Sequence, residues 1–165
     1  MLPKIETILY ATDLEAGASL VFRYALSLAQ KYDAKIAILH VIEPLTPFGQ
    51  SLVEQYLSHQ ESETLHQEAR ATLTRELEKR LEQFCQEELA DDPQGRNRVK
   101  SIDVIEAQPA LAICDQAEAL NVDLIVMGAH RHSAVGDALL GSTAHKVVHR
   151  TDRPTLLVRI PEGTP

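Results

Sequence analysis

VDLIVMGAHRHSAVGDALLGSTAHKVV, residues 122–148, is the stretch that decides the fold. Its apolar run 124–127 predicts a strand that is covered on both faces of a sheet. A polar tract containing glycines follows and ends at Gly141-Ser142-Thr143, where Ser142 is expected to cap a helix. The core face of that helix is predicted to carry Val147 and Val148.

A buried strand, a glycine-bearing loop and a capped helix start together form a typical anion-binding site. The N–H groups of the loop and of the first helical turn point at the ligand, and the helix dipole adds positive potential. The same pattern also fits an ordinary connection between a strand and a helix with a good cap. The pattern alone leaves both interpretations open.

Composition indicates a globular protein. The chain has 165 residues, which predicts a single domain over residues 1–165. A net charge of −8 argues against nucleic acid or an anionic membrane as the main partner. No apolar run approaches the roughly 20 residues of a membrane span, and the first residues do not open a signal peptide. Cys85 and Cys114 belong to no partner motif, so a cytoplasmic location is expected.

Strand and helix patterns alternate along the chain. Strands are predicted at 5–10, 34–42, 99–106, 124–127 and 155–160, and helices at 16–32, 61–89, 109–120 and from 142 onward. The segment 43–58 is expected to be a loop or a broken helix start. Alternation of this kind predicts an α/β fold, a three-layer α/β/α sandwich around a five-stranded parallel sheet with right-handed crossovers.

The long helix carries an apolar residue at every fourth position, which predicts that one face of it packs on the core. The row consists of Leu65, Ala69, Leu73, Leu77, Leu81, Cys85 and Leu89.

Two polar residues stand near the ends of predicted strands. Asp13 follows the first strand, at the edge where open α/β sheets bind ligands, although it also suits a role in bracing the following turn. His40 lies in the second strand and is expected to be a hydrogen-bonded histidine of the sheet rather than a ligand.

The spacing of Gly128-Ala129-His130-Arg131, nine further residues and Gly141-Ser142 resembles the universal stress protein family, in its nucleotide-binding branch. Segments 8–13, 39–42 and 153–158 are similar to the family's opening, second and closing strands. The resemblance therefore covers nearly the whole chain.

This resemblance implies a Rossmann-like fold, related to the adenine nucleotide alpha hydrolases, with strand order 3-2-1-4-5. It also implies a homodimer through the last strand, 155–160, and an adenine nucleotide, ATP or ADP or AMP, at the carboxyl ends of the first and fourth strands. In the implied site, Ala11, Asp13 and Val41 line the adenosine, Met127 and Gly128 begin the phosphate loop, Arg131, His132 and Ser133 lie within it, and Gly141, Ser142 and Thr143 hold the phosphates.

The chain departs from the family pattern at Arg131, which stands where the second glycine belongs. Glycine there would let the loop adopt positive φ close to the phosphates. Arginine instead offers a charged guanidinium to phosphate oxygens. Two outcomes are open, a charged clamp on the phosphates or a loop that no longer closes on them.

Three functions compete at this stage. The first is a dimeric nucleotide-binding regulatory protein of the stress response, whose protein partner the sequence does not name. The second is a slow ATPase or phosphoryl transferase, in which Asp13 helps to hold a phosphate-bound Mg²⁺. The third is a dimerisation module without nucleotide. No catalytic residue stands out, and the pairs His130/His132 and His145/His149 are treated as surface histidines rather than a metal site.

Overall fold

The computed structural model describes residues 1–55, 59–129 and 141–164. These residues form a five-stranded sheet in the order β3-β2-β1-β4-β5, and each neighbouring pair is parallel. The predicted α/β fold and the order 3-2-1-4-5 are confirmed. The strands are β1 (Thr7–Thr12), β2 (Lys35–Ile42), β3 (Val99–Glu106), β4 (Leu124–Ala129) and β5 (Thr155–Arg159).

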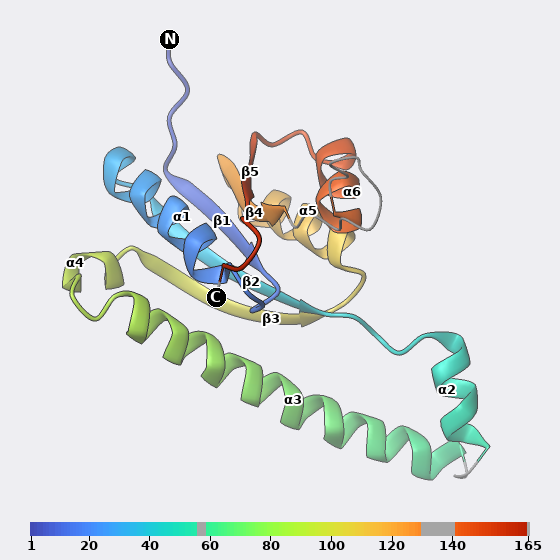
Figure 1. Ribbon diagram of the computed structural model, residues 1–165. Coiled ribbons are helices and arrows are strands. Elements are labelled where there is room, and N and C mark those ends of the chain that lie inside the picture. Colours follow the sequence, from blue (N-terminus) through green and yellow to red (C-terminus); the bar gives the residue numbers. More distant parts are fainter. Residues whose placement is uncertain (56–58, 130–140, 165) are drawn as a thin grey trace.

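Helices lie between the strands in the chain (Figure 1). They are α1 (Ala18–Tyr32), α2 (Pro47–Glu54), α3 (His59–Glu88), α4 (Pro93–Arg96), α5 (Pro109–Ala119) and α6 (Ser142–Arg150). The segment predicted as a loop or a broken helix start therefore contains α2, which begins at Pro47 behind the cap residue Thr46. The connection between α3 and β3 holds the single-turn helix α4, which begins behind the cap residue Asp92.

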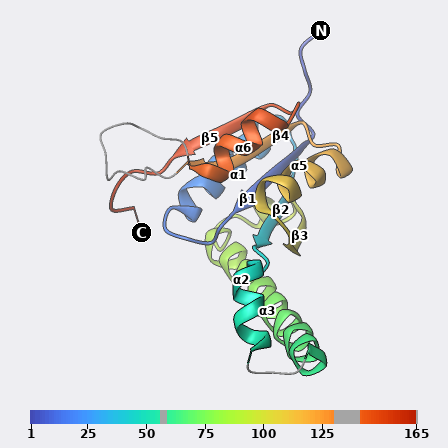
Figure 2. The same cartoon turned by 90° about the vertical axis from the view of Figure 1, so that its right-hand side faces the viewer.

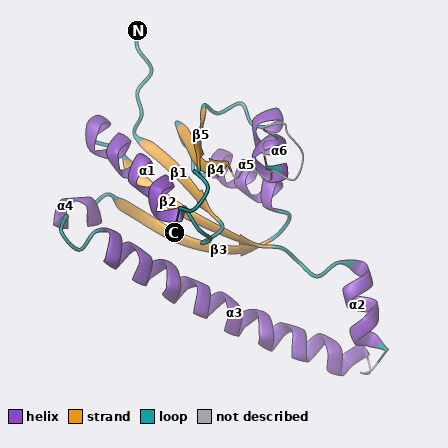
Figure 3. Cartoon of the chain, viewed as in Figure 1, coloured by secondary structure: helices purple, strands orange, loops and turns teal. Residues whose placement is uncertain are grey.

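The sheet is covered on both faces, which gives three layers (Figures 2 and 3). Alternate residues of β1 enter separate cores: Ile8 and Tyr10 pack with α1 and α3, whereas Leu9 and Ala11 pack with α5 and α6. This period-two pattern with both faces apolar is what a buried parallel strand requires.

β1 begins and ends two residues later than predicted, because its pairing with β2 continues from Ala11↔Leu39 to Thr12↔His40. Asp13 is consequently the first residue after the strand.

The apolar row of α3 is only partly buried, which corrects the prediction. Leu81 and Cys85 are buried against the sheet, but Leu65 and Leu73 are 53% and 43% exposed. The first half of α3 extends with α2 beyond the end of the sheet, so this half has no strand to cover it (Figures 1 and 2). A regular row of apolar residues predicts a helix, but it does not show how much of that row the sheet covers.

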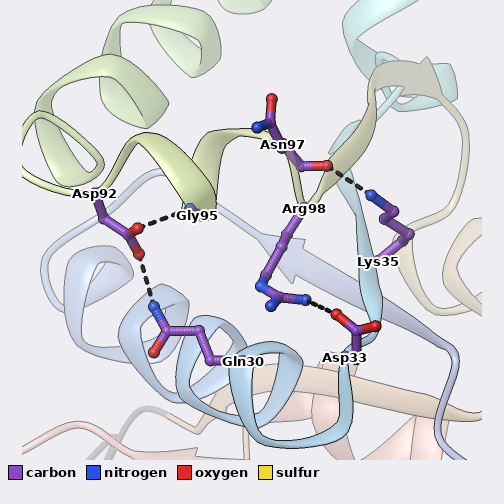
Figure 4. A network of polar contacts seen from close by, with 7 residues as sticks. All are labelled: Gln30, Asp33, Lys35, Asp92, Gly95, Asn97 and Arg98. Carbon is purple, nitrogen blue, oxygen red and sulfur yellow. Dashed lines mark hydrogen bonds and ion pairs between the residues drawn. The ribbon is translucent and has the colours of Figure 1, made fainter.

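Polar contacts join the turn around α4 to the end of α1 (Figure 4). The Asp92 carboxylate accepts from Gly95 N at 2.8 Å through Oδ1, and from Gln30 Nε2 at 2.6 Å through Oδ2. Close by, Arg98 NH1 donates to Asp33 Oδ1 at 2.8 Å. Asp92 therefore both caps α4 and ties it to α1.

Replacing Asp92 by alanine should lower the free energy of unfolding by about 1–2 kcal/mol, since a helix cap and a second hydrogen bond are lost together. Urea denaturation measures this change. The matched control is Asp91→Ala, which removes the same charge from the exposed neighbouring position. If both variants lost the same free energy of unfolding, the removal of a charge and not the loss of the cap would explain the effect.

Candidate functional site

A cavity of about 620 Å³ opens at the carboxyl ends of β1, β2 and β4, where the strand order reverses. Open α/β sheets bind ligands at this position. Its walls come from the ends of these strands, from the turn between β1 and α1, and from the starts of α5 and α6. The lining residues are Tyr10, Ala11, Thr12, Asp13, Glu15, Ala18, Val21, Leu39, His40, Val41, Glu43, Pro109, Ile113, Met127, Gly128, Gly141, Ser142, Thr143, Ala144 and Ile160.

The structure brings together eight of the residues predicted for nucleotide binding. Ala11, Asp13, Val41, Met127, Gly128, Gly141, Ser142 and Thr143 all line this cavity. The other three, Arg131, His132 and Ser133, lie outside the described residues. Segments separated by more than a hundred positions in the sequence therefore meet in one place.

The start of α6 differs in detail from the prediction. Gly141 is the cap residue and Ser142 is the first residue of the helix, with no side-chain cap hydrogen bond. Ser142 is thus not the cap residue, and it is one of the residues that line the cavity. Val147 is buried as predicted, but Val148 is 44% exposed because it lies a further 100° round the helix.

The turn between β1 and α1 forms the opposite wall and is fixed by side-chain hydrogen bonds. Thr12 Oγ1 accepts from Leu14 N at 3.0 Å, and Asp13 Oδ1 accepts from Glu15 N at 3.0 Å. Leu14 has φ 59° and Gly17 has φ 87°, so the chain turns sharply here. Asp13 therefore braces the turn, as one of the two alternatives predicted, and it also lines the cavity, so its role in ligand binding stays a prediction.

His40 is hydrogen-bonded within the sheet, as expected. Its Nδ1 lies 2.9 Å from the carbonyl oxygen of Thr12, and because that oxygen only accepts, Nδ1 carries the proton. His40 also lines the cavity, which sequence reasoning did not expect. Its place next to Val41 at the end of β2 was the signal that could have identified it.

Other lining residues were also missed. Glu15 and Glu43 follow β1 and β2 closely, so their distance from the strand ends is a signal that the sequence already contains. Ile160 follows β5, which borders only β4, and nothing in the sequence pattern points to the cavity.

The residues that line the cavity include acidic, hydroxyl-bearing and imidazole residues as well as apolar ones. In the part of the chain that the structure describes, no group of three or more His, Cys, Asp or Glu side chains could hold a metal ion. Burial raises the pKa of the Cys85 thiol to about 11, so this cysteine stays protonated at neutral pH. Among the same residues, no helix combines the length and hydrophobicity that a membrane span needs.

Known proteins resemble this chain over most of its length. A universal stress protein of Thermus aquaticus is 35% identical over 154 residues, which are 93% of this chain and 98% of the relative. The solved structure of MJ0577, a universal stress protein of Methanocaldococcus jannaschii, superimposes with a TM-score of 0.72 at 24% identity and covers 98% of this chain and all of its own.

The structure of a universal stress protein from Archaeoglobus fulgidus in complex with dAMP has a TM-score of 0.55 at 17% identity, and it covers 92% of this chain and 96% of its own. Finally, the model of the universal stress protein family matches residues 4–159. A match over this length, together with the Thermus aquaticus relative, means that the chain belongs to the universal stress protein family.

Proposed function

We propose that this protein binds an adenine nucleotide, ATP or its shorter forms ADP and AMP, and serves as a cytoplasmic regulatory protein of the stress response. The observation that carries the proposal is that all eight described residues predicted for nucleotide binding line one cavity. The family member from Archaeoglobus fulgidus binds dAMP, which supports an adenine nucleotide as the class of ligand.

The cavity suits such a ligand in size and in hydrogen-bond donors. Its volume of about 620 Å³ lies within the usual range for small-molecule sites. His145 N donates to Gly141 O at 2.9 Å, so the amides of Ser142, Thr143 and Ala144 precede the first helical hydrogen bond. These amides and the helix dipole would hold phosphate oxygens. A phosphate-bound Mg²⁺ near Asp13 belongs to the same proposal.

We also propose a homodimer through β5, which is an edge strand of the sheet. Ile125 N donates to Pro154 O, and Ile160 N donates to Ala129 O. Because donors alternate along a parallel pair, the N–H groups of Leu157 and Arg159 point away from β4. An edge with free backbone groups and apolar neighbours favours pairing with a second copy.

The competing functions are separated by measurement. A slow ATPase would show turnover that falls on Asp13→Ala, whereas a regulatory protein would retain its nucleotide unchanged. A dimerisation module would bind no nucleotide.

The charged clamp of Arg131 on the phosphates stays a prediction, since that residue lies outside the described part of the chain. The protein partner that reads the bound state is likewise not named.

Purified protein should release ATP, ADP or AMP when it is denatured by heat, and mass spectrometry of the supernatant identifies the nucleotide. Calorimetry on the stripped protein then measures its affinity. Finding no released nucleotide and no heat of binding at millimolar ATP would rule out the proposed function.

The variant Ser142→Ala should weaken ATP at least about tenfold and AMP clearly less, because a hydrogen bond to a charged phosphate contributes about 1.5–3 kcal/mol. Calorimetry with both nucleotides measures the difference. Ser27→Ala, an exposed serine in the middle of α1, is the matched control and should leave both affinities unchanged. Equal losses for ATP and AMP would place Ser142 away from the terminal phosphates.

The variant Arg159→Pro should convert the dimer to monomer, because proline removes an outward N–H group of β5. The wild-type Arg159 side chain is exposed, so its loss should affect the core little. Arg159→Ala keeps the N–H and should remain dimeric. Sedimentation at tens of micromolar measures the mass. A monomeric wild-type protein at this concentration would contradict the proposed dimer.

A further inference from the structure

Ile160 lies between the turn before α1 and the end of β4, although it comes after the last strand. Its N–H donates to Ala129 O at 3.3 Å, which extends the pairing of β5 with β4 by one residue. The side chain is 8% exposed and lines the cavity. It therefore reaches the end of β4 and the start of α1 at once.

Two glycines make room for this side chain. A Cβ on Gly17 would lie 2.5 Å from Cγ2 of Ile160, and Gly17 has φ +87°, so a larger residue is excluded there. A Cβ on Gly128 would lie 3.0 Å from Cδ1 of Ile160 and 3.4 Å from Cγ2 of Val21. The atom of Ile160 nearest to a Cβ on Gly17 is Cγ2 and the one nearest to a Cβ on Gly128 is Cδ1, although Cδ1 also lies 2.9 Å from a Cβ on Gly17.

We propose that Ile160 is a positioning residue for nucleotide binding, which fixes Gly128 at the start of the phosphate loop against the turn at Gly17. The inference rests on the proposed function, since it concerns the same cavity. Through Ile160, the C-terminal end of β5 controls the affinity of the site for phosphates.

The physical basis is preorganisation. A strand end that is packed on three sides holds its backbone in one position, so little conformational entropy is lost when a ligand binds. Removing the contact at Cδ1 lets the end of β4 move. The cost should fall on ligand groups beside Gly128, which are the phosphates, and not on the adenosine beside Asp13 and Val41.

The variant Ile160→Val tests this, because it deletes Cδ1 and keeps the contact of Cγ2 with Gly17. ATP should bind about fivefold more weakly, while adenosine should stay within about twofold of wild type. The matched control is Ile36→Val, the same change at a fully buried position near the other end of the sheet. Calorimetry with ATP and adenosine on the three proteins measures the split.

A double variant adds an independent check. Gly128→Ala alone should weaken ATP, because its methyl group meets Cδ1 of Ile160. In Gly128→Ala/Ile160→Val the new methyl group takes the vacated space, so the affinity should return to within about threefold of wild type. If the double variant lost the product of the two single losses of ATP affinity, the proposal would be overturned. Equal losses of affinity for ATP and for adenosine in Ile160→Val would also overturn it.

Hydrogen exchange on the protein without nucleotide separates the effect of Ile160 on the end of β4 from nucleotide binding itself. Amides of residues 124–129 should exchange severalfold faster in Ile160→Val and unchanged in Ile36→Val. If wild-type protein binds no adenine nucleotide, the proposed function fails, yet the exchange rates still decide whether Ile160 fixes the end of β4. Equal rates in both valine variants would refute that role.

Discussion

The two-sided burial of β1 is the constraint on which the rest of the structure depends. This strand is hydrogen-bonded to β2 on one side and to β4 on the other. Ile8, Leu9 and Tyr10 have no exposed surface, and they alternate between the two cores. Polar chemistry in such a strand would be desolvated along its length. On this part of the chain, the acidic residues that line the cavity therefore come after the strand, at Asp13 and Glu15.

One of the described non-glycine residues with positive φ, Leu14, lies just after the end of β1. Leu14 adopts a left-handed conformation that costs a non-glycine residue on the order of 1–2 kcal/mol. Thr12 and Asp13 hold it by accepting from the next amides, and Leu14 packs against the core beneath α1. Tyr10 adds a hydrogen bond from its hydroxyl to Ala18 O at 2.9 Å. The contacts that maintain this strained turn are also those that shape one wall of the cavity.

Local patterns predicted most of the strands and helices, and the family resemblance implied the strand order and the eight residues that line the cavity. Sequence reasoning failed where the outcome depends on what a residue faces. Leu65 and Leu73 continue a regular apolar row, but no strand lies beneath them. Ser142 has the chemistry of a cap, yet Gly141 takes that position. Ile160 enters the cavity only because Gly17 and Gly128 lack a Cβ, a relation between three distant segments that no local pattern contains.

The charges around the cavity favour one orientation of the proposed nucleotide, and they do so independently of the family resemblance. The cavity side chains after β1 and β2 include the carboxylates of Asp13, Glu15 and Glu43. Phosphates placed there would be repelled unless Mg²⁺ intervened, whereas ribose hydroxyls can donate to carboxylates. At the other end, the first turn of α6 offers backbone N–H groups and the positive end of a dipole. Under the proposed function, these charges favour a nucleotide with its adenosine toward β1 and β2 and its phosphates toward α6, and a phosphate-bound Mg²⁺ would then have to lie between the phosphates and Asp13.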